Sequence, residues 1–378
     1  MGNKYFIVAG EHSGDLHASN LVKQIRAKDP SAVFSGAGGP MMKKNGVTLH
    51  YDLTAVSVIG FVEVLRHIRY FRKVFSSVAG IIRSERPDVV ILVDYPGFNM
   101  RLAKVVKKMG IKVLYYISPQ VWAWKRNRVV KMAEIADKLM VIFPFEKEYY
   151  EKTSLDVEFI GHPLVDILKE RMKKEAFFDM LGFSPDRKLI GILPGSRENE
   201  VKKLLPVILR AARILYEEYG VKQYVIGCAS KELEPIIRSE AEKSPVEIKI
   251  SMDLTFDIMK HSDFVIASSG TATLQTGFFG TPMVIVYKVS WFTYFLGKKL
   301  IKIPYIGLAN VVLEEKVVPE LIQNDANPEE IAKQVSCIMA NKDKYMEIKN
   351  KLGRIKELLG APGASERAAE IAVNMAAR

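Results

Sequence analysis

Two carboxylates in the first half of the chain follow apolar runs, at positions where acid–base chemistry could be done. Asp94 comes directly after Val-Val-Ile-Leu-Val, and Glu11 follows the first apolar run, residues 5–9. Such runs predict buried strands, and a carboxylate at the carboxyl end of a strand is well placed to act as a general base. The alternative for both residues is a turn-capping role, which is common for acidic side chains. Asp15 is expected to cap the helix that follows it.

Two loops in the second half of the chain combine glycine with small hydroxyl residues. Pro194-Gly195-Ser196-Arg197 follows a strand and opens a helical pattern, so helix N–H groups and the Arg197 guanidinium could hold a phosphate. The second loop supplies Ser268, Ser269, Gly270, Thr271, Ala272, Thr273 and Gln275. Either loop alone could be an ordinary helix cap. Together they predict a site for a diphosphate-bearing nucleotide, although neither a Walker A loop nor a G-x-G-x-x-G fingerprint occurs.

No set of side chains has the sequence spacing of a metal centre. His12 and His17 are five apart with no third ligand nearby, and neither HExxH nor paired Asp-x-Asp occurs. We therefore expect no metal and no cofactor, so Arg, Lys and helix N-termini must meet the charge of a leaving diphosphate. His162, before Pro163, is expected to be a structural residue between domains.

The elements that must position these residues alternate between short strands and helices. Near-continuous apolar runs between helical patterns are typical of parallel sheets buried on both faces. The runs are at 5–9, 33–35, 89–93, 113–116, 139–142, 189–193, 223–226, 247–250, 264–267 and 283–286. A charged helix is predicted over 166–174, and the chain reads as helical from 328 onward. We predict an α/β fold of two doubly wound, Rossmann-like domains facing across a cleft, because ligands of such domains bind beyond the strand C-termini.

Composition and charge limit the compartment and the partners. The chain has 378 residues, 48% apolar and 26% charged, as in an ordinary globular protein. Its two cysteines, Cys228 and Cys337, are isolated, which suits a reducing compartment. No signal peptide is expected, and the uncharged stretch 264–287 is too polar for a membrane span. The formal charge of +12 indicates an anionic partner.

Two basic-aromatic segments favour an anionic membrane surface as that partner. Apolar residues at helical spacing run through 61–82, with arginines on the other side, and a second cluster lies at 291–302. The candidate surface residues are Phe61, Arg66, Arg69, Phe71, Trp291, Phe295, Lys298, Lys299 and Lys302. Aromatics mixed with Lys and Arg suit an interface with anionic lipid, although such a stripe is usually core with a solvated basic face. Nucleic acid is not expected, because no nucleic-acid-binding signature accompanies the charge.

Taken together, the motifs resemble those of the lipid-A-disaccharide synthases, inverting bacterial glycosyltransferases of the two-domain B type. The matching segments, in family order, are Ala-Gly-Glu-His-Ser-Gly-Asp at 9–15, Val-Asp-Tyr-Pro-Gly-Phe-Asn at 93–99, Tyr-Ile-Ser-Pro-Gln-Val-Trp-Ala-Trp-Lys at 116–125, Pro-Phe-Glu at 144–146, Gly-His-Pro-Leu at 161–164, Leu-Pro-Gly-Ser-Arg-x-x-Glu at 193–200 and Ser-Gly-Thr-Ala-Thr-Leu at 269–274. The resemblance covers almost the whole chain.

The resemblance implies transfer of 2,3-diacylglucosamine from UDP to 2,3-diacylglucosamine 1-phosphate (lipid X), giving the β-1,6-linked disaccharide 1-phosphate and UDP. It implies an acceptor-binding domain at 1–165, a UDP-sugar-binding domain at 166–340, and C-terminal helices at 341–378 that pack back on the first domain. The protein would be cytoplasmic and peripheral on the inner face of the cytoplasmic membrane. A homodimer is one of the expected oligomeric states.

The resemblance also assigns roles to individual residues. Asp94 matches the proposed base and Glu11 a second acidic residue in the acceptor half. The residues expected to line the acceptor side are Ser13, Asn99, Ser118 and Trp122. Those expected at the donor are Ser196, Arg197, the 268–275 loop, Asn310, Glu320 and Gln323.

Two departures from the family pattern concern the donor side. Gln275 stands where the family usually has a glutamate that can bind a ribose hydroxyl, and residues 311–316 differ from the usual segment after Asn310. The alternatives are a UDP-N-acetylglucosamine 2-epimerase, another transferase using UDP-N-acetylglucosamine such as a polyprenyl-linked one, and a non-enzymatic nucleotide-sugar-binding module. The epimerase would not need the basic-aromatic surfaces, and the binding module would not need a cleft carboxylate.

Overall fold

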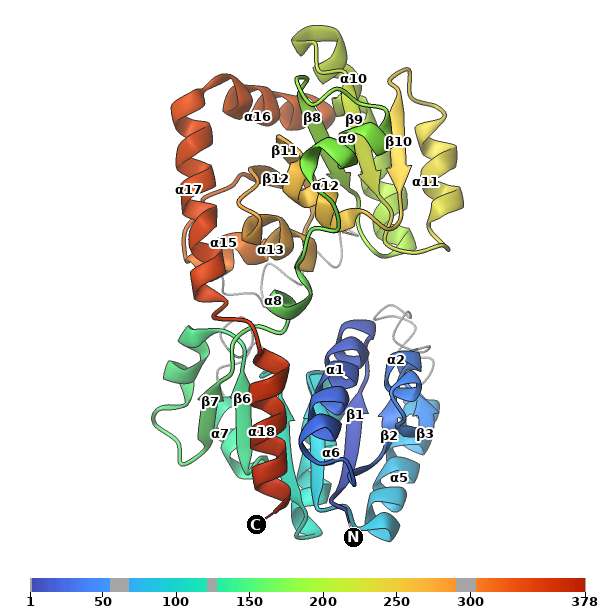
Figure 1. The fold of residues 1–378 in the computed structure, drawn as a ribbon, viewed down its shortest axis with the longest axis vertical. Coiled ribbons are helices and arrows are strands. Elements are labelled where there is room, and N and C mark those ends of the chain that lie inside the picture. The colour runs from blue at the N-terminus through green and yellow to red at the C-terminus, as the bar shows by residue number, and fades with distance from the viewer. Residues whose placement is uncertain (1, 55–67, 120, 122–127, 290–303, 378) are drawn as a thin grey trace. The chain divides into compact units, whose positions relative to one another are not determined.

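The structure is a computed structural model that describes residues 2–54, 68–119, 121, 128–289 and 304–377 (Figure 1). The chain divides into two compact units, one made of Met1–Asp166 with Leu359–Arg378 and the other of Ile167–Leu358. Each unit is built around one parallel sheet with helices on both faces. The predicted fold class of two doubly wound α/β sheets is confirmed.

The first unit holds a seven-stranded parallel sheet in the order β3-β2-β1-β4-β5-β6-β7. Its strands are β1 (Lys4–Ala9), β2 (Val33–Gly38), β3 (Thr48–Asp52), β4 (Val89–Val93), β5 (Lys112–Tyr116), β6 (Lys138–Val141) and β7 (Asp156–Phe159). From β1 the chain builds outward to β3, then returns to the other side of β1 for β4. The strand order therefore reverses between β1 and β4, which is where ligands of such sheets bind.

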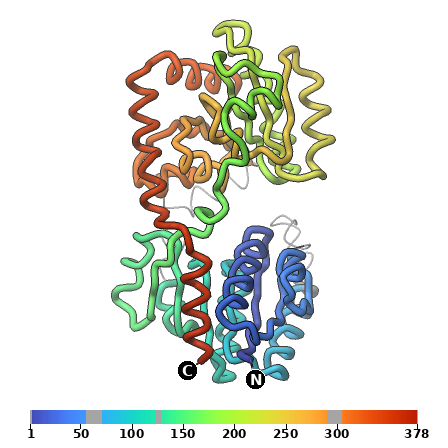
Figure 2. The backbone as a smooth tube through the Cα atoms, in the orientation of Figure 1, coloured from blue at the N-terminus to red at the C-terminus, as the bar shows by residue number. Residues whose placement is uncertain are grey.

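Helices cover both faces of this sheet. They are α1 (His12–Lys28), α2 (Pro40–Lys44), α5 (Ile68–Glu85), α6 (Pro96–Lys108), α7 (Arg128–Ile135), the 3₁₀ helix η1 (Pro144–Tyr150), α8 (Leu164–Ile167) at the boundary of the unit, and α18 (Ala364–Ala376). Right-handed crossovers put α1 and α2 on one face and α5, α6 and α7 on the other. The C-terminal α18 packs along α1, so both ends of the chain contribute to one helical layer (Figure 2).

The second unit holds a six-stranded parallel sheet in the order β10-β9-β8-β11-β12-β13. Its strands are β8 (Leu189–Leu193), β9 (Gln223–Gly227), β10 (Ile248–Ser251), β11 (Phe264–Ser268), β12 (Met283–Tyr287) and β13 (Glu320–Ile322). Its helices are α9 (Lys174–Leu181), α10 (Glu198–Tyr219), α11 (Glu234–Ala241), α12 (Thr255–His261), α13 (Thr271–Phe278), α15 (Leu308–Leu313), α16 (Pro328–Ala340) and α17 (Lys342–Leu358). Here the order reverses between β8 and β11.

The cores explain why the central strands could be recognised as continuous apolar runs. Every residue of β1 after Lys4, and every residue of β4, β8 and β11, is buried. Val74, Val78 and Ile82 of α5 are also buried in the core of the first unit. The expectation that the whole 61–82 stripe faces a membrane is therefore wrong for this helical part, because its apolar side packs on the sheet.

The structure corrects two further expectations. The helix predicted over 166–174 is absent: α8 ends at Ile167, and α9 starts at Lys174. Between them the backbone N–H groups of Arg171 and Met172 donate to the Asp257 carboxylate instead of continuing a helix. Residues 341–378 also do not act as one group, because α17 belongs to the second unit and only the segment from Leu359 onward joins the first.

Candidate functional site

Asp94 and Glu11 lie together at the β1/β4 reversal of the first unit. Ala9 at the end of β1 is the register partner of Val93 at the end of β4, so the residues beyond both strands leave the sheet at the same edge. The pKa of the Asp94 carboxyl is raised to about 7, first by burial and second by the negative charge of Glu11, against a hydrogen bond from the backbone N–H of Tyr95. A carboxyl with such a pKa can take up and release a proton near neutral pH.

The turn that carries Asp94 has an unusual backbone. Asp94 and Tyr95 both have positive φ, 45° and 48°, in a region that residues other than glycine rarely adopt. The ring of Tyr95 lies against Gly10, where an added Cβ would stand 2.1 Å from the ring carbon Cδ1. Gly10 is therefore required for the two loops to approach each other. Strain of this kind is concentrated at functional sites.

The residues expected beside the acceptor are placed in different ways. Ser13 is exposed in the first turn of α1, as is Glu11 at its N-cap. Asn99 is fully buried, and its amide donates to the backbone oxygens of Val93 and Asp94. Ser118 is also buried, with its hydroxyl 3.0 Å from the hydroxyl of Tyr150. Asn99 and Ser118 thus lie beneath the site rather than on its surface, and Trp122 lies outside the described residues.

Two other polar residues near this edge have structural roles. The buried carboxylate of Asp15 accepts hydrogen bonds from the backbone N–H groups of Gly39, Met41 and Met42. It therefore caps α2, not the helix α1 on which it stands, which corrects the expectation. His162 is buried in the first unit, where burial lowers its pKa to about 3, and its Nδ1 accepts from the N–H of Leu164.

The predicted phosphate-binding loops of the second unit meet at the β8/β11 reversal. Leu193 and Ala267, at the ends of these strands, are register partners. The loops enclose a cavity of about 260 Å³ at the N-termini of α10 and α13. Of the expected donor residues, those lining it are Ser196, Arg197, Ser268, Ser269, Gly270, Thr271, Ala272 and Gln275. Helix N-termini with free N–H groups and an exposed arginine make this cavity suitable for an anion.

Glu200 occupies part of this loop in the structure. Its Oε2 accepts from the backbone N–H of Ser196, and an added Cβ on Gly195 would lie 2.2 Å from that oxygen. Burial raises the pKa of the Glu200 carboxyl, opposed by Arg197 and by the two backbone amides. The carboxylate thus holds the turn in the manner of a capping box.

Four expected donor residues lie outside the lining of the cavity. Thr273 is buried and donates to the carbonyl of Gly270. Asn310 uses both donors and both acceptor positions of its amide on Val317, Val318 and Glu320. A side-chain amide has no further capacity, so Asn310 supports its loop and cannot bind a ligand directly. Glu320 accepts from the N–H groups of Ile306 and Gly307, and Gln323 bonds both backbone groups of Val289.

Sequence reasoning missed several residues that line the cavity or support the turn. Gly227, Ala229, Thr255 and Met259 line the cavity. A weak signal existed, because Gly227 ends the neighbouring strand β9. The contribution of Tyr115, whose hydroxyl donates to the carbonyl of Asp94, had no signal in the sequence.

Most of the residues expected at the membrane surface lie outside the part of the chain that the structure describes. Phe61, Arg66, Trp291, Phe295, Lys298, Lys299 and Lys302 lie outside the described residues, as does the side chain of Arg69. Phe71 is half-buried on α5. Within the described part of the chain, no helix is long and apolar enough to cross a membrane, and no group of three His, Cys, Asp or Glu side chains could hold a metal ion.

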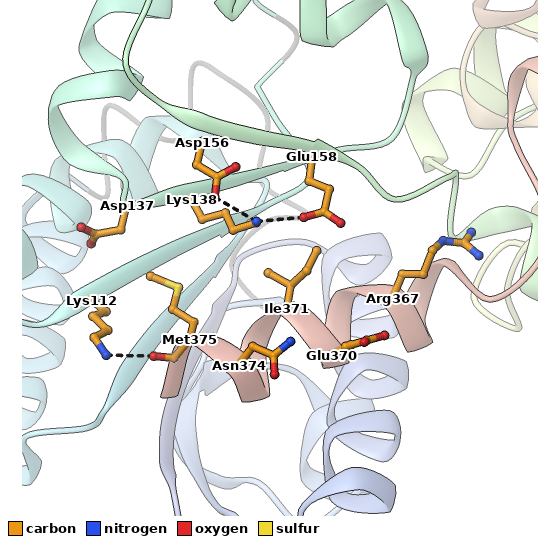
Figure 3. A pocket seen from close by; sticks show the side chains of 10 residues that line it. All are labelled: Lys112, Asp137, Lys138, Asp156, Glu158, Arg367, Glu370, Ile371, Asn374 and Met375. Carbon is orange, nitrogen blue, oxygen red and sulfur yellow. Dashed lines mark hydrogen bonds and ion pairs between the residues drawn. The ribbon is translucent and has the colours of Figure 1, made fainter. Parts of the chain in front are cut away.

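A second hollow lies in the first unit, between α18 and the strands β5, β6 and β7 (Figure 3). It measures about 590 Å³, and charged residues dominate its lining. Lys138 points toward both Asp156 and Glu158 and pairs with them, while Lys112 donates to the carbonyl of Met375. None of the expected site residues lines this hollow. Its cations are already engaged within the protein, Lys138 by ion pairs and Lys112 and Arg367 by hydrogen bonds to backbone carbonyls.

The fold defines a class: two-unit α/β proteins of the GT-B type. Solved structures agree on the fold. UDP-GlcNAc 2-epimerase from Neisseria meningitidis, bound to UDP-GlcNAc, gives a TM-score of 0.64 at 14% identity, covering 98% of this chain and 100% of that one. The calicheamicin glycosyltransferase CalG4 gives 0.65 at 13% identity, covering 100% and 99%.

Sequence comparison is more specific than these folds. The family model described as lipid-A-disaccharide synthetase matches residues 5–375. The lipid-A-disaccharide synthase of Geobacter metallireducens is 42% identical over 372 residues, 98% of this chain and 97% of that protein. Lipid-A-disaccharide synthase 1 of Legionella pneumophila is 36% identical, covering 96% and 94%. The chain belongs to the lipid-A-disaccharide synthase family.

Proposed function

We infer that this chain is a hexosyltransferase that joins UDP-2,3-diacylglucosamine to lipid X, giving the β-1,6-linked disaccharide 1-phosphate and UDP. The observation that carries the inference is the family match over residues 5–375, supported by relatives that are about as long as this chain. The epimerase alternative is not favoured, because the epimerase structures are only 13–16% identical and share the fold alone.

In the proposed reaction the first unit supplies the base. Asp94 takes the proton from the 6-hydroxyl of lipid X while that oxygen attacks the anomeric carbon of the donor sugar. The bond from this carbon to the diphosphate breaks on the opposite side, so the configuration inverts and no covalent enzyme intermediate forms. The raised pKa of Asp94 supports this role, because a base with a pKa near the working pH combines availability with strength.

The second unit is proposed to bind the UDP and stabilise it as it leaves. The cavity between the 195–197 and 268–272 loops offers backbone N–H groups, hydroxyls and the Arg197 guanidinium. Preorganised donors of this kind stabilise charge that develops in the transition state. We propose that they suffice without a divalent metal, so EDTA should leave the activity unchanged.

An anionic membrane is the proposed surface on which the lipid substrates are met. Helices α5, α6 and α7 carry seven exposed cations that make no ion pair with any described residue. They are Arg72, Lys73, Arg83, Arg101, Lys104, Lys108 and Lys131. Each Lys or Arg near an anionic bilayer contributes roughly 1 kcal/mol of attraction, which salt screens. This layer adds to the basic-aromatic segments predicted from the sequence.

The central test mixes purified protein with radiolabelled UDP-diacylglucosamine and lipid X in detergent and follows the disaccharide phosphate and UDP. Formation of both products in equal amounts supports the function. Release of the 2-epimer, or no turnover with binding of UDP alone, would contradict it. A parallel reaction in EDTA tests the metal proposal, which strict dependence on Mg²⁺ or Mn²⁺ would overturn.

The membrane proposal is tested by sedimentation with phosphatidylglycerol vesicles at low and high salt. Changing Lys298, Lys299 and Lys302 together to Ser, or Arg101, Lys104 and Lys108 together to Ser, should move protein from pellet to supernatant and raise KM for vesicle-bound acceptor. The matched control changes three exposed lysines of α17, Lys342, Lys344 and Lys349, to Ser. Equal pelleting of all variants would remove the membrane proposal and leave the transferase assignment intact.

A further inference from the structure

The carbonyl of Asp94 is held by two buried side chains that cannot themselves reach a substrate. The Asn99 amide nitrogen donates to this carbonyl at 2.8 Å and to that of Val93 at 3.1 Å. The Tyr115 hydroxyl donates to the same Asp94 carbonyl at 2.8 Å. Both side chains are fully buried. Their influence on the reaction must therefore pass through Asp94.

These contacts coincide with the strained part of the backbone. The last sheet bond of the strand runs from the Asp94 N–H to the Tyr116 carbonyl, and the chain then turns through two consecutive residues with positive φ. The Asp94 carbonyl is not bonded within the sheet ladder, and a part-buried carbonyl needs other donors. Asn99 and Tyr115 supply them. The turn persists only while the surroundings determine it.

The oxygen of the Asn99 amide shows that the amide has one favourable orientation. Its Oδ1 is buried and has no hydrogen-bond partner among the described residues. The opposite orientation would bring this oxygen against two carbonyl oxygens, so only the observed one is favourable. Leaving a buried acceptor unpaired is costly, and such groups in native proteins call for a specific explanation. The placement of the donor on the Asp94 turn is that explanation.

We propose that Asn99, assisted by Tyr115, is a positioning residue that locks the Asp94–Tyr95 turn so that the Asp94 carboxylate keeps its half-buried position as the base. The proposal rests on the proposed function, because the role of Asp94 belongs to it. It also replaces the expectation that Asn99 contacts the acceptor.

The test compares Asn99→Ala and Tyr115→Phe with Leu102→Ala, a matched change at a fully buried residue of the same helix. Asn99→Ala should lower kcat by up to about 10²-fold, as misplacing a reacting group does, with KM for the donor within threefold. The acid limb of its pH–kcat profile should move below pH 7, because the released carboxyl becomes better hydrated. Tyr115→Phe should lower kcat and move the acid limb in the same directions, but by less. Leu102→Ala should lower only the unfolding temperature.

The outcomes distinguish the positioning role of Asn99 from the base role of Asp94. Parental kcat and pH profile in both Asn99→Ala and Tyr115→Phe would overturn the positioning role, whatever their stability. If Asn99→Ala does not fold, Tyr115→Phe alone decides by the same two readouts. Substantial activity in Asp94→Asn would instead remove the base assignment on which the proposal rests. UDP affinity, measured by calorimetry, should stay within a few-fold of the parent in every variant because the UDP cavity belongs to the other unit.

Discussion

In the first unit the strand order reverses between β1 and β4, and the residues beyond those strands are the carboxylates Glu11 and Asp94. In the second unit it reverses between β8 and β11, and the residues there are glycine, hydroxyl side chains and Arg197. The topology is the same, but the electrostatics are opposite. One site places the half-buried Asp94 beside the exposed Glu11, so that desolvation and the neighbouring negative charge raise the Asp94 pKa. The other directs N–H groups and a guanidinium at an anion. Topology therefore decides where a site forms, and a few loop residues decide whether it moves protons or binds phosphate.

The comparison is most strongly tested by removing the base. Asp94→Asn should lower transfer by about 10²–10⁴-fold, the range for a lost general base, while UDP affinity stays within a few-fold. Rate measurements check the loss of transfer, and calorimetry checks the UDP affinity. The control is Asp156→Asn, an exposed aspartate of the same sheet, which should keep its rate. A variant at position 94 with more than a tenth of the activity would show that Asp94 is not the base.

The second change addresses the anion site. Arg197→Ala should weaken UDP binding by roughly 1.5–3 kcal/mol, because a charge-assisted contact to phosphate is lost. Arg213→Ala on α10, the helix that Arg197 precedes as N-cap, removes an exposed arginine that pairs with Glu217 and should have no effect. Calorimetry with UDP measures both. Equal affinity of the Arg197 variant and the parent would exclude this arginine from the phosphate site.

A smaller effect is expected from the negative charge of Glu11 beside Asp94. The base must be ionised, so kcat should fall as the pH drops below the Asp94 pKa of about 7. Glu11→Gln removes the neighbouring negative charge that helps to raise this pKa, so the acid limb should move to lower pH. The pH dependence of kcat in detergent measures the shift. An acid limb that stays in place, or moves upward, would mean that Glu11 does not act on Asp94 electrostatically.

The central architecture could be predicted from the sequence because its signals are local. Buried strands such as β4 and β8 read as unbroken apolar runs, and the loops after them carry the polar residues. The strands β3, β7 and β13 left no such signal, since they lie at sheet edges and contain exposed or half-buried residues. Because Asp94 and Arg197 follow predicted strands, their place at the carboxyl edge of each sheet could be predicted.

What could not be predicted depends on contacts between distant segments. Asn310 and Thr273 stand in motifs that suggest ligand binding, yet their side chains form hydrogen bonds within their own loops. Nothing in the sequence shows that Asp94 adopts a left-handed backbone, because the donors that support it come from α6 and β5. The lining residues Thr255 and Met259 join the cavity through the packing of α12.

The first unit is assembled from residues up to Asp166 and from the segment that starts at Leu359, with the whole second unit between them. On the ribosome, where domains generally fold as they emerge, residues 167–358 are complete before α18 has been synthesised. The buried alanines of α18, such as Ala364, Ala368 and Ala372, can cover α1 only after that point. The second unit is thus expected to mature first, and the surface that α18 will cover stays open to chaperones until α18 has been synthesised.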